Sequence, residues 1–293
     1  MKIFLPGASG FVGHRVLHDL RARGHEVVAP SHREADISNF DDMLRAVPEG
    51  TEAIVYLPGL LREFPRKGLT FERIHVQGVR NLVKVAKENG IRRWIELSAL
   101  GARPNASTPY FRTKFEAEEL IRKSGLDFTV LRPSVIFDSR PTSRKHFVGE
   151  LAKAIRQLPF LPILGDGHYR MQPVSLEDVS QSICQSLDKP ETIGKTFELG
   201  GPDRLSYREI VRTIGRAMKK KKLELKIPMS LANNAARLLG RFEFFPFTVG
   251  ELTMMKEENI IKEQKYYADW QKTFALANLA FTPEIISGSL DED

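Results

Sequence analysis

Short apolar runs alternate with amphipathic stretches through the first two hundred residues of the chain. The apolar runs predict strands, and the stretches with a helical period, a capping residue and a closing glycine predict helices. The predicted strands cover residues 3–5, 26–30, 53–57, 93–98, 128–131 and 196–199. The predicted helices cover residues 11–23, 39–47 with Ser38 as the cap, 70–89, 109–123 and 179–187.

Regular alternation of this kind predicts an α/β fold with a Rossmann-type, doubly wound parallel sheet. After residue 199 the pattern becomes mostly helical, which predicts a smaller C-terminal substrate domain. We assign residues 1–138 and 168–201 to the nucleotide-binding domain, and residues 139–167 and 202–293 to the smaller one. Parallel sheets bind their ligands beyond the carboxyl ends of the strands, so candidate site residues are sought there.

The chain carries a net charge of +7 and a single cysteine, Cys184. The dense lysine run at 219–222 closes a helical pattern and has no aromatic residues between its lysines, so nucleic acid is not the expected partner. An anionic cofactor or substrate, a protein complex or a membrane surface fits the charge better. We expect Cys184 to be a small core residue, no disulfide and no metal site. We also expect a cytoplasmic location, at a membrane surface if a membrane is the partner, because the apolar start is too short for a secretory signal.

Three glycines at a spacing of three residues follow the first predicted strand, in GASGFVG. At a strand–helix junction this pattern predicts a dinucleotide site: Gly7 takes a positive φ, Gly10 admits the pyrophosphate and Gly13 lets the helix pack closely. The start of the helix then faces the phosphates. The expected contacts are Gly7, Ser9, Gly10, Phe11, Val12 and Gly13. A glycine-rich turn without a ligand is the alternative.

The residues after the second predicted strand are expected to determine which of the two nicotinamide dinucleotides, NADP(H) or NAD(H), the protein binds. Ser31, His32 and Arg33 come first and suit a 2′-phosphate, so NADP(H) is favoured over NAD(H). Glu34 follows directly and is the argument for NAD(H). We expect Asp36 and Ile37 to meet the adenine edge, with a capping or turn role as the alternative for Asp36. Backbone of Leu57, Pro58 and Gly59, at the end of the third strand, would run beside the ribose and pyrophosphate.

A candidate catalytic set follows the fourth predicted strand. Ser98 ends that strand, and Tyr110 and Lys114 lie four residues apart on the next helix, which places them on one face. A lysine ammonium beside a tyrosine lowers the pKa of the phenol, and such a tyrosine can move a proton while a hydride moves at nicotinamide. Ser98 could hold the substrate oxygen. An ordinary exposed helix is the alternative, and we take Glu118–Arg122 and Glu119–Lys123 as surface pairs.

The motifs GASGFVG, ELSALGA and LRPSVIF, together with the Tyr110/Lys114 pair, resemble the extended short-chain dehydrogenase/reductase superfamily. Within it, YFRTKFEAEELIRKSGLDFTVLRPSVIF, MQPVSLEDVS and FELGGP are similar to an atypical branch of the NAD-dependent epimerase/dehydratase type. That branch includes the nucleotide-binding accessory subunit of respiratory complex I and its bacterial relatives. The resemblance covers residues 1–215 well and the remainder loosely.

The resemblance implies a role for several further positions. Tyr110 and Lys114 would touch the nicotinamide ribose, and residues from Pro133 to Val135 the carboxamide. Gln172, Pro173 and Val174 would lie where the sheet meets the smaller domain. Two positions depart from the family's pattern: His75 stands near a place where active members often carry asparagine, and Asp138 where many relatives carry glycine.

Two functions are therefore expected. The first is an NADP(H)-preferring oxidoreductase or epimerase that acts on an unknown small molecule through Ser98, Tyr110 and Lys114. The second is a non-catalytic protein that binds the nucleotide as a structural or redox-sensing ligand and belongs to a larger, respiratory-type complex. Phe242, Phe244, Phe245 and Phe247 are expected first in the core, then as an apolar substrate contact, then as a membrane-facing patch.

Overall fold

The computed structural model describes residues 1–142, 144, 146–240 and 247–290. The chain forms two compact units. The first unit comprises Met1–Pro133, Val179–Leu199 and Gln264–Leu276, and the second comprises Ser134–Asp178, Gly200–Glu263 and Ala277–Asp293. Phe242, Phe244 and Phe245 lie outside the described residues.

A six-stranded parallel sheet is the centre of the first unit, which confirms the predicted Rossmann-type fold. Its strands are β1 (Lys2–Phe4), β2 (Glu26–Val28), β3 (Ala53–Tyr56), β4 (Arg93–Leu97), β5 (Asp127–Pro133) and β10 (Lys195–Leu199). Their spatial order is β10-β5-β4-β3-β1-β2, so the order reverses at β1, which pairs with both β2 and β3. Ligands of open parallel sheets bind at such a reversal.

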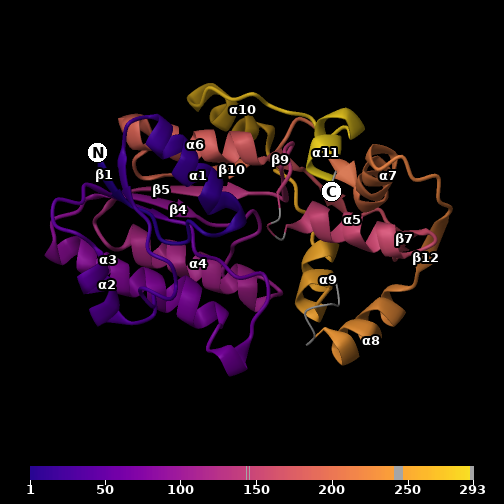
Figure 1. Cartoon of the computed structure of the whole chain (residues 1–293), viewed down its shortest axis with the longest axis horizontal. Coiled ribbons are helices and arrows are strands. Elements are labelled where there is room, and N and C mark those ends of the chain that lie inside the picture. The colour runs from indigo at the N-terminus through magenta and orange to yellow at the C-terminus, as the bar shows by residue number, and fades with distance from the viewer. Residues whose placement is uncertain (143, 145, 241–246, 291–293) are drawn as a thin grey trace. The chain divides into compact units, whose positions relative to one another are not determined.

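Helices cover both faces of this sheet (Figure 1). They are α1 (Phe11–Ala22), α2 (Phe40–Ala46), α3 (Gly78–Glu88), α4 (Pro109–Arg122), α6 (Leu176–Asp188) and α10 (Gln264–Thr273), with single turns at Pro65–Lys67, Glu72–Gln77 and Pro190–Thr192. Figure 1 shows α2, α3 and α4 below the sheet and α1, α6 and α10 above it. The strands β3 and β4 are buried along their whole length, as strands covered on both faces must be.

The structure divides the chain differently from our sequence-based assignment in several segments. Residues 134–138, 168–178 and 200–201 belong to the second unit, although we placed them in the nucleotide-binding domain. Residues 264–276 belong to the first unit, although we placed them in the smaller domain. The indole Nε1 of Trp270 donates to Ser182 Oγ at 2.9 Å, and Phe274 packs edge-on against Phe197 of β10 at 5.1 Å between ring centroids. The sequence pattern does not show this return because the segment is separated from its partners by most of the second unit.

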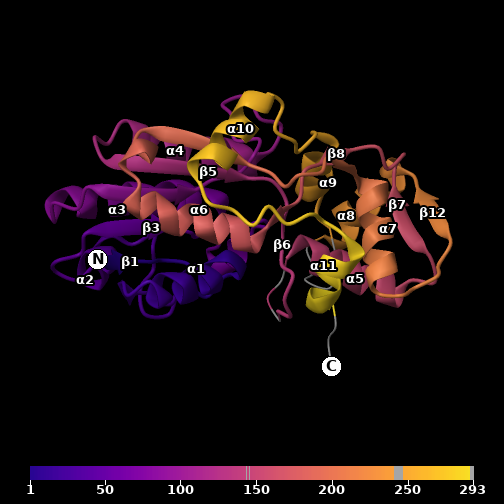
Figure 2. The ribbon, with the colours of Figure 1, turned by 90° about the horizontal axis from the view of Figure 1, so that it is seen from above.

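The second unit combines helices with short strand pairs. Its helices are α5 (Phe147–Gln157), α7 (Tyr207–Ala217), α8 (Met229–Leu239), α9 (Val249–Lys256) and α11 (Pro283–Leu290). Its strands are β6 (Ile136–Phe137), β7 (Leu161–Leu164), β8 (Arg170–Met171), β9 (Val174–Ser175), β11 (Leu205–Ser206) and β12 (Glu224–Ile227). Figure 2 shows β12 beside β7, with α7 next to them. The pairs β12–β7 and β11–β8 are strands that the sequence did not predict.

Two predicted helices differ in detail. The side chain of Asn39, and not Ser38, caps α2 by accepting hydrogen bonds from the N–H groups of Asp41 and Asp42. The predicted long helix over 70–89 is a π-helical turn, Glu72–Gln77, followed by α3. No helix among the described residues is both long and apolar enough to cross a bilayer.

Candidate functional site

The turn between β1 and α1 is built from glycines that leave no room for a side chain. Gly7 has φ +83°, and a Cβ on it would lie 2.8 Å from the backbone nitrogen of Pro58. A Cβ on Gly13 would lie 2.1 Å from the carbonyl oxygen of Gly7. The start of α1 therefore packs closely against the turn, and the turn packs closely against the segment that follows β3.

The start of α1 suits an anion. Gly10 is the residue before the helix and offers no side-chain cap, and the first helical turn carries no acidic residue. The positive end of the helix dipole thus lies at the sheet's reversal point, and the first turn of α1 itself places no carboxylate there. A glycine turn packed this closely by backbone, at such a helix start, fits the pyrophosphate of a dinucleotide.

Glu34 occupies part of the loop that follows β2. Its carboxylate accepts a hydrogen bond from the backbone N–H of Ser31 at 2.7 Å. The hydrogen bonds from Ser31 hold the pKa of Glu34 below its ordinary value, so the group is charged. His32 and Arg33 are exposed beside it. Glu34 thus takes one donor that a phosphate could use, while the imidazole and guanidinium remain on the surface.

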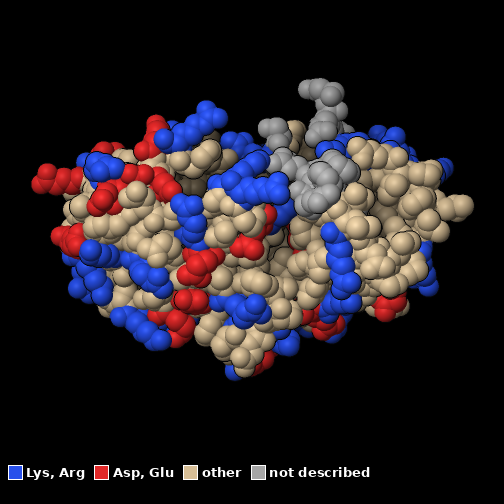
Figure 3. All heavy atoms as spheres, turned by 90° about the horizontal axis from the view of Figure 1, so that it is seen from below, with Lys and Arg blue, Asp and Glu red and all other residues tan. Residues whose placement is uncertain are grey.

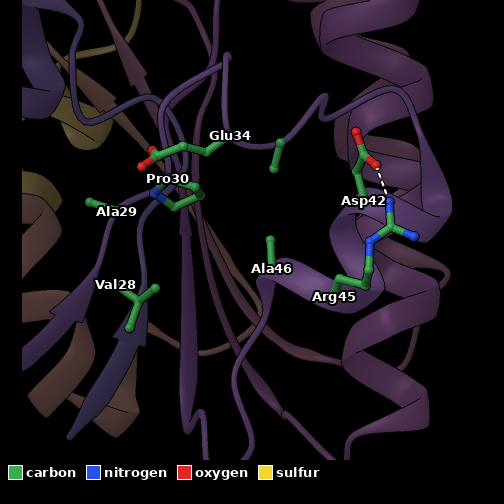
Figure 4. A pocket seen from close by; sticks show the side chains of 8 residues that line it. Val28, Ala29, Pro30, Glu34, Asp42, Arg45 and Ala46 are labelled. Atoms are coloured by element: carbon green, nitrogen blue, oxygen red, sulfur yellow. Dashed lines mark hydrogen bonds and ion pairs between the residues drawn. The ribbon is translucent and has the colours of Figure 1, made fainter.

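A cavity of about 390 Å³ opens at the end of β2 (Figure 4). It is lined by Val28, Ala29, Pro30, Glu34, Ala35, Asp42, Arg45 and Ala46. Arg45 and Asp42 pair with each other at 2.5 Å on its α2 side. Glu34 is the residue that the cavity shares with the predicted 2′-phosphate loop.

Asp36 and Ile37, the predicted adenine contacts, are tied to the protein. One oxygen of Asp36 accepts from the N–H and the hydroxyl of Ser38, at 2.9 and 2.7 Å, and the other accepts from Arg73 at 2.9 Å. This is the turn role that we weighed against an adenine contact. The carbonyl of Ile37 accepts from the side-chain amide of Asn81 at 3.2 Å.

Lys114 contacts the segment that follows β3, which in turn borders the glycine turn. Its ammonium donates to the carbonyl oxygen of Leu97 at 2.8 Å and to that of Pro58 at 3.4 Å. A Cβ on Gly59 would sit 3.8 Å from Lys114 Nζ. The structure therefore joins three predicted groups: Gly7 contacts Pro58, and Pro58 and Gly59 contact Lys114.

Glu96 of β4 is a site residue that sequence reasoning missed. It is fully buried, its Oε1 lies 3.9 Å from Lys114 Nζ, and its Oε2 accepts from the indole of Trp94 at 3.2 Å. Burial raises the pKa of Glu96 to about 8 and lowers the pKa of Lys114. Oε1 has no hydrogen-bond donor among the described residues. The only sequence signal was a carboxylate inside an otherwise apolar strand, in RWIEL.

The expected effect of Lys114 on Tyr110 is wrong in direction. Burial raises the pKa of Tyr110 to about 12, whereas we predicted a lowered value. The tyrosine ring packs edge-on against His75 and Phe71, at 5.5 and 5.8 Å between centroids, and against Phe111 at 5.3 Å. The Lys114 ammonium contacts two carbonyls and Glu96, so its charge does not offset the cost of burying a charged Tyr110 phenolate, and the pKa of Tyr110 is not lowered.

Ser98 is engaged by a second carboxylate, Glu118 of α4. The serine hydroxyl donates to Glu118 Oε1 at 2.5 Å. Arg132 donates to both oxygens of Glu118, at 2.8 and 2.6 Å, and Arg122 adds a bond at 3.0 Å. Glu118 is fully buried, so the pair with Arg122 is not the surface pair that we predicted. A helix period alone could not reveal partners that come from β4 and β5.

His75 is buried in the π-helical turn. Its Nε2 accepts from the N–H of Leu60 at 3.1 Å and its Nδ1 lies 2.9 Å from Thr113 Oγ1. Because Nε2 is an acceptor, the ring is neutral with its proton on Nδ1. Burial, with a smaller contribution from the Lys114 charge, lowers the pKa of His75 well below its ordinary value. His75 thus links the chain after β3 to the helix that carries Tyr110.

The remaining predicted positions make contacts of other kinds. The carbonyl of Pro133 accepts from the N–H of Leu100 at 2.9 Å, and Val135 belongs to the second unit, where its carbonyl accepts from Val174. Gln172 is buried in the second unit and donates to the carbonyl of Gly201 at 2.8 Å. Cys184 is buried, which confirms its expected core role, and burial raises the pKa of its thiol to about 12.

Comparison with known proteins assigns the class. A model of the NAD dependent epimerase/dehydratase family matches residues 3–200. This span contains the glycine turn, the loop after β2, and the Tyr110/Lys114 helix. The chain therefore belongs to the NAD dependent epimerase/dehydratase family.

The relatives fall into two groups. The chain is 28% identical over 251 residues to NADH dehydrogenase [ubiquinone] 1 alpha subcomplex subunit 9, mitochondrial, of Arabidopsis thaliana, with 78% of this chain and 61% of that protein covered. It is 26% identical over 224 residues to the uncharacterized sugar epimerase YhfK of Bacillus subtilis, with 68% and 94% covered. The solved UDP-glucose 4-epimerase of Thermus thermophilus, in complex with NAD, matches with a TM-score of 0.71 at 16% identity, with 99% of each chain covered. This last likeness is one of fold.

Proposed function

We propose that the protein binds a nicotinamide dinucleotide at the carboxyl end of β1, with the pyrophosphate against the turn of Gly7, Gly10 and Gly13. The observation that carries the proposal is the position of a Cβ on Gly13, 2.1 Å from the Gly7 carbonyl oxygen, at an uncapped helix start. Membership of the family supports it, as does the likeness in fold to the Thermus epimerase, whose structure is a complex with NAD. When bound, the dinucleotide would supply hydride chemistry at its nicotinamide.

The proposed preference is for NADP(H). Ser31, His32 and Arg33 supply hydroxyl, imidazole and guanidinium donors at the end of β2, and both His32 and Arg33 are exposed. An arginine fork matches the oxygens of a 2′-phosphate. Glu34 opposes a phosphate by its charge, but that charge is already paired to the Ser31 N–H.

The bound nucleotide is proposed to act as a structural or redox-sensing ligand. Two of the three side chains of the candidate catalytic set are engaged by the protein itself: Ser98 by Glu118, and Lys114 by two carbonyls and Glu96. Tyr110 carries a raised pKa, which disfavours the proton transfer that chemistry there would require. The similarity to a complex I subunit is consistent with a protein complex as the partner.

The second candidate is an oxidoreductase or epimerase that acts on a nucleotide sugar. Tyr110 and Lys114 are both on α4, one turn apart, as such chemistry needs. The Bacillus relative named as a sugar epimerase is covered over 94% of its length, which supports this candidate.

Paired titrations of the nucleotide-free protein with NADPH and NADH test the binding site. We expect NADPH to bind more tightly than NADH. Arg33→Ala is expected to weaken the binding of NADPH by about tenfold and to change the affinity for NADH little. Arg21→Ala is the control, since Arg21 is an exposed arginine in the last turn of α1, outside the loop after β2. Absence of binding for either nucleotide would overturn the proposal.

Tyr110→Phe separates the two candidate functions. We expect the wild-type protein to show no turnover of UDP-glucose with bound NAD or NADP, and Tyr110→Phe to bind the nucleotide as tightly as the wild type. Tyr266→Phe, at an exposed position, is the matched control. Turnover by the wild type that Tyr110→Phe abolishes and Tyr266→Phe retains would establish the second candidate instead.

A further inference from the structure

One surface segment of the second unit combines strong positive charge with exposed leucines. We call residues 219–240, which follow α7 and form β12 and α8, the lysine–leucine segment. It carries six Lys or Arg residues and one carboxylate, Glu224. Glu224 is paired with Arg212 and, at 3.5 Å, with Arg208 of α7, so its charge is already compensated. No acidic residue occurs between positions 225 and 240.

A hollow of about 440 Å³ lies at the start of this segment. Its lining includes Arg216, Lys220, Lys221 and Lys222, together with Leu223. Lys222 is used within the fold, because its ammonium donates to the carbonyl oxygens of Ile155 and Leu158 at the end of α5. No carboxylate among the described residues pairs with the side chains of Arg216, Lys220 and Lys221. The hollow thus presents three uncompensated cations.

The strand β12 exposes two leucines beside these cations. Leu223 is 86% exposed and Leu225 is 48% exposed. Side chains alternate between the two faces of a strand, so these leucines share one face while Glu224 and Lys226 take the other. The pairing of β12 with β7 leaves its second edge without a strand partner among the described residues.

The helix α8 carries apolar residues on two opposite sides. Met229, Ala232 and Ala236 face the core of the second unit, and Ala236 is buried. Leu231 and Leu238 are 59% and 71% exposed. At 100° per residue, these two leucines lie on one line along the helix, on the side away from the core. A helix that only closes the core needs polar residues at such positions.

We propose that the lysine–leucine segment docks this protein on the surface of a lipid bilayer that contains anionic phospholipid. Leucines on an outward helix face enter the boundary between headgroups and acyl chains, and lysines beside them attract anionic headgroups. A symmetric contact between two copies would bring the same cations together, which argues against a second copy as the occupant. Where α8 faces the viewer, on the right of Figure 3, the surface is mainly uncharged, with Lys and Arg side chains at its edges and some Asp and Glu side chains along the lower edge.

Flotation of the full chain with vesicles tests this docking surface. We expect binding to vesicles of equal parts phosphatidylcholine and phosphatidylglycerol, and none to vesicles of phosphatidylcholine alone. Added salt should weaken the binding, because the headgroup attraction is screened. Equal binding to both vesicle types, or binding to neither, would overturn the proposal.

Two pairs of variants locate the binding surface. Lys220→Ala with Lys221→Ala is expected to weaken binding roughly thirtyfold, at about 1 kcal/mol per lysine. Leu231→Ser with Leu238→Ser is expected to weaken it by about tenfold or more, from lost apolar insertion. Lys222 is left unchanged because it caps α5.

Matched controls come from the first unit. Lys87→Ala with Lys123→Ala removes the same charge from exposed positions, and Leu44→Ser with Leu61→Ser removes two exposed leucines. These control pairs should leave vesicle binding unchanged. All four pairs of variants should leave nucleotide affinity unchanged, so the outcome for lipid docking is independent of the outcome for nucleotide binding. Light scattering that shows a dimer, lost in the leucine pair of α8, would assign the surface to a second copy and overturn lipid docking.

Discussion

Two neighbouring parts of the first unit contact the same residue, Pro58, and are built in opposite ways. The glycine turn after β1 is packed by backbone in place of side chains, because the three atoms nearest to a Cβ added on Gly7 or Gly13 all belong to the main chain. Around Lys114 the contacts are made by side chains instead: its ammonium contacts the carbonyls of Leu97 and Pro58 and the carboxylate of Glu96. The first region is built from backbone that can receive a ligand, whereas in the second the lysine charge is already engaged by the protein.

This difference separates binding from chemistry. A cradle of backbone atoms needs no side-chain charge and no rearrangement to receive a phosphate. A proton-transfer centre needs a tyrosine whose pKa lies near the working pH, and here burial raises the pKa of Tyr110 to about 12. The comparison therefore predicts that nucleotide binding depends on the turn and is insensitive to the second region.

Gly13→Ala is expected to have the largest effect. The new Cβ would meet the Gly7 carbonyl oxygen at 2.1 Å and Ala8 Cα at 2.7 Å, both of them backbone atoms that cannot turn aside. We expect nucleotide binding to be lost and the free energy of unfolding to fall by about 3 kcal/mol. A titration with NADPH and a urea denaturation curve measure the two effects.

Alanine at two other glycines should have smaller effects than Gly13→Ala. A Cβ on Gly10 would approach only the Gly7 carbonyl oxygen, at 3.2 Å, so Gly10→Ala should keep most of the stability yet weaken binding, because the pyrophosphate needs that space. Gly250→Ala, in α9, meets only Thr248 Oγ1 at 3.8 Å and is the neutral control. Full binding by Gly13→Ala would show that the turn is not the cradle.

Glu118→Gln sharpens the other side of the comparison. It removes the charge that Arg132, Arg122 and Ser98 share in a buried position, and we expect the free energy of unfolding to fall by about 2 kcal/mol. Nucleotide affinity should stay within a factor of about three. Glu119→Gln, whose partners are surface groups, should cost less than about 0.5 kcal/mol. A large loss of affinity in Glu118→Gln would make this network part of the binding site.

Glu96→Gln is expected to change the pH dependence of stability. The folded protein holds the pKa of Glu96 at about 8, above the ordinary 4.5, so between these values the folded state keeps a proton that the unfolded state releases. Stability from this group is therefore present below pH 4.5 and is lost as the pH rises toward about 8. The glutamine cannot ionise, so the free energy of unfolding of the variant should rise relative to that of the wild type over this range, by at most about 1.4 kcal/mol per pH unit. Urea denaturation curves of both proteins across this pH range measure the difference in their free energies of unfolding. A difference that does not change with pH would contradict the prediction.

Much of the first unit could be predicted from local pattern. Strands covered on both faces are short apolar runs, and the parallel order follows from their alternation with helices, so the sheet and the glycine turn were foreseen. The positive φ of Gly7 and the close packing at Gly13 could be predicted from the spacing of the glycines between a strand and a helix, because a tight turn there leaves few other conformations.

Contacts between distant segments could not be predicted. Glu118 looked like one member of a surface pair because its true partners are distant in the sequence: Ser98 directly follows β4, and Arg132 lies on β5. The direction of the Tyr110 pKa depended on where the Lys114 ammonium points, which is set by the carbonyls of two strand ends. The predicted cap at Ser38 failed because Asn39, one residue later, reaches two N–H groups of α2.

The π-helical turn at Glu72–Gln77 has a consequence for the length of the chain. A π turn holds one residue more than an α-helical turn over the same rise, and it carries His75. Deleting one residue of the turn on the N-terminal side of His75 would rotate the residues before the deletion by about 100° relative to α3. The extra residue thus fixes how the segment that leads into the turn is oriented around the axis of α3.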